Sequence, residues 1–104
     1  MNSKPIIQAQ FLSTLLTKKY QFIDLRDPYE FKKLHLSPFI NIPLDSFDEH
    51  ISQLSKQIPI ILLCYTGHRS LKLAQSLNQL GYHAYSVEGG FYTIQYELKR
   101  HSSF

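Results

Sequence analysis

Hydrophobic and polar residues are distributed along this chain so that they predict strands and helices in alternation. Short apolar runs that suit strands are separated by stretches in which apolar residues recur at helical spacing. We expect strands at 5–7, 20–25, 39–42, 58–63 and 83–87. We expect helices at 9–16, 29–34, 45–54 and 91–98, and one that begins shortly after Cys64 and stops at Gly81. Such alternation with short connections predicts an α/β domain with a mostly parallel sheet.

The most hydrophobic stretch of the chain is 58–63, which ends directly before Cys64. A continuous apolar run of this length is typical of a central parallel strand that is covered on both faces. Open parallel sheets bind ligands at the carboxyl ends of their strands. The pattern therefore places Cys64 at the edge of the sheet where a ligand site is expected.

Two helix starts carry local signals. Asp27 precedes Pro28, so that Asp27 is expected to cap a helix whose first position suits proline. Asp45 opens 45–54 and is expected to cap a second helix, which carries Phe47 and Ile51 on one face.

Composition narrows the class of protein. The 104 residues are 43% hydrophobic, which suits one folded domain over 1–104 and argues against global disorder. The net charge is only +3, and scattered Lys and Arg residues predict no nucleic-acid site. A single cysteine excludes an internal disulfide. Because the chain shows neither a signal-peptide core nor a run of about 18 apolar residues, we expect a cytoplasmic protein without a membrane span.

The segment that follows the apolar strand combines a thiol with groups that favour an anion. A thiolate, not a thiol, is the nucleophile, and Cys64 precedes a predicted helix N-terminus whose free amides stabilise negative charge. Gly67 allows the loop to curl so that these amides point inward. Thr66 and Ser70 add hydroxyl groups, and Arg69 adds a planar, permanently charged guanidinium. The combination predicts a cradle for a sulfur anion or oxyanion.

Other interpretations of these residues are weaker. A lone cysteine after an apolar strand is also typical of a small buried hydrophobic residue, but Gly67, Arg69 and Ser70 favour a reactive thiol. Arg69 would sit unfavourably near a helix N-terminus unless an anion offset its charge. His68 is expected to be a loop or surface histidine, and dispersed histidines with one cysteine predict no zinc site.

From Cys64 to Ser70 the sequence resembles the active-site loop of the rhodanese family, in which a Cys, four residues and an Arg are followed by Ser. Segments 22–31, 35–36, 41–43, 80–82 and 88–91 resemble further family motifs in the same order. The resemblance covers about 7–98. It departs from the family at Leu34 and Phe39, where glycine is frequent, and near Ile94, where tryptophan often stands.

The resemblance implies a rhodanese-like α/β fold with a five-stranded sheet and helices on both faces. It implies a sulfurtransferase without cofactor, in which Cys64 accepts sulfur from a small anion such as thiosulfate and passes the persulfide sulfur to cyanide, a thiol or a partner protein. The implied substrate-binding residues are Tyr65, Thr66, Gly67, His68, Arg69 and Ser70. Asp24 and Arg26 are expected to brace the loop as a structural ion pair.

Two alternatives stay open. Tyrosine phosphatases and arsenate reductases also pair a Cys with an Arg, but five residues separate them there, whereas four separate Cys64 from Arg69. A persulfide relay or regulatory binding module would keep the same loop and show little activity with thiosulfate. Because the chain has only one cysteine, a resolving partner for a persulfide on Cys64 must come from outside the monomer.

Overall fold

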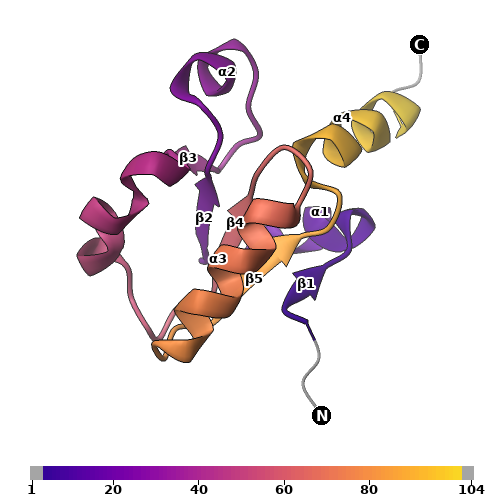
Figure 1. Ribbon diagram of the computed structural model, residues 1–104. Coiled ribbons are helices and arrows are strands. Elements are labelled where there is room, and N and C mark those ends of the chain that lie inside the picture. The colour runs from indigo at the N-terminus through magenta and orange to yellow at the C-terminus, as the bar shows by residue number, and fades with distance from the viewer. Residues whose placement is uncertain (1–3, 102–104) are drawn as a thin grey trace.

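A five-stranded parallel sheet forms the centre of the molecule. The computed structural model describes residues 4–101 (Figure 1). The strands are β1 (Ile6–Ile7), β2 (Gln21–Asp24), β3 (Ile40–Asn41), β4 (Ile60–Leu63) and β5 (Ala84–Val87). Their order across the sheet is β1-β5-β4-β2-β3, and every neighbouring pair is parallel. The expected α/β fold with a central strand within 58–63 is therefore confirmed.

The helices connect the strands and match the predicted segments with shifted ends. They are α1 (Leu12–Leu15) behind a short 3-10 turn η1 (Ala9–Phe11), α2 (Pro28–Lys33), the 3-10 segment η2 (Leu44–Gln53), α3 (His68–Gln79) and α4 (Gly90–His101). The expected end of α3 is confirmed, because Gly81 follows it with a φ of +97°. None of the described helices is long and apolar enough to cross a membrane. The domain expected over 1–104 includes terminal residues that lie outside the described part.

The helix expected at 45–54 with an Asp45 cap is wrong in type and in its start. The segment is a 3-10 helix whose preceding residue is Pro43, and no side chain caps it. The amide of Leu44 donates a hydrogen bond of 3.1 Å to the Leu25 carbonyl, and the amide of Ser46 donates to Pro43. These bonds anchor the chain to the end of β2 and start the turn before Asp45, which leaves Asp45 inside the first turn.

Hydrophobic cores cover both faces of the sheet. On one face, α3 and η2 pack through residues such as Leu77 and Phe47 against β4 and β2. On the other, α1 and α4 contribute Leu12, Phe91 and Ile94. Figure 1 shows α3 in front of the sheet and α1 behind it. The side chains of β4 are at most 1% exposed, which explains why this strand has no polar residue.

The parallel register brings the strand ends together. Asp24 at the end of β2 pairs with Leu63 at the end of β4, and Ser86 near the end of β5 pairs with Leu62. Cys64 leaves β4 at this edge, and α3 begins four residues later. The fold thus places the expected chemistry where the ends of three strands meet.

Candidate active site

The sulfur of Cys64 lies in a cradle of hydrogen-bonding groups. The amides of Gly67 and Ser70 donate to Sγ over 3.1 Å and 3.4 Å, and the Ser70 hydroxyl oxygen lies 3.2 Å from Sγ. The residue is only 5% exposed. A thiol donates to the Ser70 oxygen, whereas a thiolate accepts from the hydroxyl. With the N-terminus of the twelve-residue α3 beside it, the sulfur is placed where negative charge is stabilised.

Gly67 is required by conformation and by space. Its φ is +95°, in the left-handed region that favours glycine, and it precedes the first residue of α3. A Cβ on Gly67 would lie 2.9 Å from the amide nitrogen of Gly89. The curl predicted for this loop is therefore confirmed, and it packs directly on the turn that follows β5.

Gly90 lies on the opposite side of the same contact, and the sequence analysis placed it only in the segment 88–91 that resembles a family motif. A Cβ there would lie 2.5 Å from the carbonyl oxygens of Cys64 and Tyr65. The amide of Phe91 donates to the Cys64 carbonyl over 2.7 Å, and that of Tyr92 donates to Tyr65 over 3.2 Å. The free amides at the start of α4 thus fix the backbone of the cysteine loop.

A cavity of about 480 Å³ opens beside Cys64. Its loop wall consists of Cys64, Tyr65, Thr66 and Arg69, and its opposite wall of Leu25, Asp27, Pro28, Pro43, Leu44 and Asp45. The structure therefore brings four of the predicted loop residues to one cavity. Gly67 and Ser70 contact the sulfur instead of lining the cavity.

His68 takes a different position from the other predicted loop residues. It is exposed, and its Nδ1 lies 3.1 Å from the Thr66 hydroxyl oxygen. Within the described residues it makes no hydrogen bond to Cys64. This position agrees with the expectation of a surface histidine.

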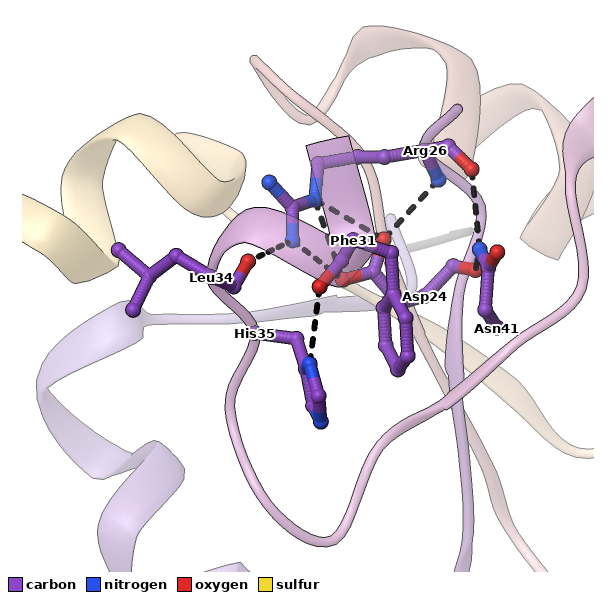
Figure 2. A network of polar contacts seen from close by, with 6 residues as sticks. All are labelled: Asp24, Arg26, Phe31, Leu34, His35 and Asn41. Carbon is purple, nitrogen blue, oxygen red and sulfur yellow. Dashed lines mark hydrogen bonds and ion pairs between the residues drawn. The ribbon is translucent and has the colours of Figure 1, made fainter. Parts of the chain in front are cut away.

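Asp24 and Arg26 form a buried ion pair at the end of β2 (Figure 2). The Arg26 Nε lies 3.1 Å from both carboxylate oxygens of Asp24, and Nη2 lies 3.0 Å from Oδ2. Nη2 also donates to the Leu34 carbonyl over 2.7 Å. The guanidinium lies 3.6 Å from the centre of the Phe91 ring and 5.9 Å from that of Tyr65. Arg26 therefore links the end of β2 to the loop after α2, to α4 and to the cysteine loop.

The same network extends to β3. The Asn41 side-chain amide donates to the carbonyls of Asp24 and Arg26, each over 2.9 Å. Nearby, the His35 ring stacks on Phe31 with centroids 3.9 Å apart, and its Nδ1 lies 2.9 Å from the Phe31 carbonyl (Figure 2). The sequence analysis placed Phe31, His35 and Asn41 only in segments that resemble family motifs. The carbonyl groups that His35 and Asn41 contact cannot be identified from the neighbouring sequence.

Two carboxylates in the opposite wall were not predicted as site residues. Asp27 was expected only as a helix cap, and this cap is confirmed by a 2.9 Å bond from the Tyr29 amide. Asp45 was expected only as the cap of the next helix. Their positions in the sequence could have indicated this role. Asp27 follows β2, which is next to β4, and Asp45 follows β3, which is next to β2. Among the side chains that the structure describes, those of residues 4–96, no group of three or more His, Cys, Asp or Glu is arranged to hold a metal ion.

Comparison with known proteins places this geometry in a family. The thiosulfate sulfurtransferase GlpE of Tolumonas auensis is 33% identical over 69 residues, which are 65% of this chain and 65% of that protein. GlpE of Shewanella oneidensis is 30% identical over 83 residues, which are 79% of this chain and 82% of that protein. The chain thus spans slightly less than two thirds of the length of the first relative and more than two thirds of the length of the second.

Solved structures share the fold. A rhodanese-like domain protein from Staphylococcus aureus matches with a TM-score of 0.78 and 25% identity, over 86% of this chain and 89% of its own. A rhodanese-related protein from Thermoplasma volcanium matches with a TM-score of 0.80 and 31% identity, over 88% and 90%. The sequence model of the rhodanese-like domain family matches residues 8–97 of this chain. On its fold, its sequence and the cradle around Cys64, this chain belongs to the rhodanese-like family.

Proposed function

We propose that this protein is a thiosulfate sulfurtransferase in which Cys64 carries the transferred sulfur as a persulfide. The observation that carries the proposal is the position of Sγ, which receives two amide hydrogen bonds at the start of α3 and borders a cavity that Arg69 also lines. The curated relatives named thiosulfate sulfurtransferase support the choice of donor.

In the first step the Cys64 thiolate attacks the outer sulfur of thiosulfate. A bond forms between Sγ and that sulfur, the sulfur–sulfur bond of the donor breaks, and sulfite leaves with the bonding electron pair. The guanidinium of Arg69 would attract the anionic oxygens of the donor. The loop amides would stabilise the charge on Sγ before the attack and on the persulfide after it.

In the second step a nucleophilic acceptor attacks the outer sulfur of the persulfide, and the electron pair of the broken bond returns to Sγ. The chain contains one cysteine, so the acceptor thiol comes from another molecule, either a small thiol or a partner protein. Splitting the transfer into two steps through a covalent intermediate is the general advantage of a nucleophilic residue. A reducing cytoplasm suits this chemistry because it keeps Cys64 available as a thiol.

The test is the intact mass of the reduced protein after incubation with thiosulfate. We expect a gain of one sulfur atom that cyanide reverses with release of thiocyanate, and no gain in Cys64→Ser. If the folded protein with a free thiol gains no sulfur from thiosulfate but gains it from a persulfide donor, the relay function replaces the thiosulfate enzyme. Hydrolysis of an aryl phosphate that depends on Cys64 would instead support a phosphatase.

A further inference from the structure

The lining of the active-site cavity carries a net charge of opposite sign to that of the whole chain. The chain has a net charge of +3. The charged residues that line the cavity are Asp27, Asp45 and Arg69, whose formal charges give a net of −1. Both aspartates are exposed, and among residues 4–96, whose side chains the structure describes, neither is part of an ion pair. The wall opposite the cysteine loop therefore presents two exposed carboxylates, and the single positive charge of Arg69 in the lining can balance only one of them.

The floor of the cavity, in contrast, favours negative charge. There the amides of Gly67 and Ser70 point at Sγ, and the positive end of α3 adds to their effect. A molecule that fits both regions carries negative charge on sulfur at one end and positive charge a few atoms away. The cavity volume of about 480 Å³ is in the range that binds small molecules.

We propose that the sulfur acceptor of this protein is a small aminothiol, whose thiolate approaches Cys64 while its ammonium group lies against Asp27 and Asp45. The inference rests on the proposed function, because it names the acceptor for the Cys64 persulfide. A thiol with a carboxylate in place of the ammonium would bring like charges together at the same wall. If the acceptor carries a carboxylate in addition to its ammonium group, Arg69 is the lining residue that can pair with that carboxylate.

The step balances without a further reactant. The acceptor thiolate attacks the outer sulfur of the protonated Cys64 persulfide. A new sulfur–sulfur bond forms in the acceptor, the bond between Sγ and the outer sulfur breaks, and its electron pair remains on Sγ as the thiolate. The proton stays on the transferred sulfur, so that the product is the aminothiol persulfide.

Two probes of equal chain length isolate the charge. Cysteamine ends in an ammonium group and 3-mercaptopropionate ends in a carboxylate. Protein loaded with sulfur on Cys64 is mixed with each thiol, and loss of the sulfur is followed by intact mass, with rates expressed per thiolate. We expect cysteamine to react faster. The ratio of the two rates should fall by at least about five-fold in Asp45→Asn, which is the effect of one unit charge about 4 Å away in water on a single probe, because the two probes respond to that charge in opposite directions.

Matched variants control for folding and for general charge. Asp27→Asn should also lower the ratio, and asparagine keeps the helix cap. Asp48→Asn removes an exposed carboxylate from the same η2 segment that does not line the cavity, so its ratio should equal that of wild type. Higher ionic strength should shrink the wild-type preference. An unchanged ratio in both Asp27→Asn and Asp45→Asn, or a faster reaction with 3-mercaptopropionate, would overturn the inference.

A second measurement separates this inference from the proposed function. Reduced Cys64 is exposed to cystamine or to 3,3′-dithiodipropionate, and formation of the mixed disulfide is followed by mass. We expect faster exchange with the cationic disulfide, and loss of that preference in Asp45→Asn. Sulfur loading without any charge preference would overturn the aminothiol inference alone. A charge preference in a protein that accepts sulfur from no donor would overturn the proposed function alone.

Discussion

The hydroxyl oxygens of Ser70 and Ser86 lie 2.6 Å apart in the buried space beneath Cys64. Ser86 comes from β5, and both residues are at most 1% exposed. Each hydroxyl oxygen is also within 3.3 Å of the Gly67 carbonyl. When Cys64 is a thiolate, Ser70 donates to Sγ and can accept from Ser86. Ser86 thus lies in a position to orient the hydroxyl that contacts the sulfur.

Ser86→Ala removes that donor without touching the sulfur. We predict that alkylation of Cys64 by iodoacetamide at neutral pH slows about three- to ten-fold, which corresponds to one hydrogen bond. Ser76→Ala, an exposed serine on α3, serves as the control and should leave the rate unchanged. An unchanged rate in a folded Ser86→Ala protein would refute the orienting role of Ser86.

Arg69→Ala should weaken the capture of anionic donors. Arg69 lines the cavity and, among the described residues, forms no ion pair that would reserve its charge for the fold. We predict that the rate of sulfur loading at low thiosulfate concentration falls about ten-fold, as expected for the loss of one charge-assisted contact. Lys72→Ala removes a different exposed cation from α3 and should leave loading intact. Equal loss in the two variants would point to a general effect of charge.

Gly90→Ala should damage both stability and the loop. Its φ of +64° disfavours a side chain by about 1–2 kcal/mol, and the Cβ would also collide with two backbone carbonyls. We predict a drop in the free energy of unfolding, measured in urea, that exceeds the drop in Gly81→Ala. Gly81 has a similar φ of +97°, but its nearest neighbour is a flexible lysine side chain 3.8 Å away. If the two variants lost similar amounts of unfolding free energy, the positive φ would account for the whole effect and the collision with the carbonyls for none of it.

Breaking the buried pair should cost far more than breaking a surface pair. The Arg26 side chain is 3% exposed, and Asp24→Ala would remove the carboxylate that pairs with it. We predict a loss of about 3–5 kcal/mol in unfolding free energy, typical of an uncompensated buried charge. Glu30→Ala breaks an exposed pair with Lys33 and should cost less than about 1 kcal/mol. A loss in Asp24→Ala no larger than in Glu30→Ala would contradict the bracing role.

The local pattern was sufficient to predict the strands, most helices and the reactive loop, because each is a short-range property. The apolar run before Cys64 predicted the central strand, and Gly67 predicted the curl of the loop. The start of η2 at Leu44 was beyond reach, because it depends on a hydrogen bond between Leu44 and Leu25, which lie in different parts of the fold.

By itself the sequence determined that this chain forms a parallel α/β fold with one thiol at the end of its central strand. Periodicity, glycine positions and the spacing from Cys64 to Arg69 are properties of neighbouring residues and can be recognised without coordinates. Only the tertiary structure decided what surrounds that thiol, because strand order, register and helix packing bring Ser86 and Gly90 against its loop and Asp45 to its cavity. These are contacts between distant segments, and the physical chemistry of one segment does not specify its partner.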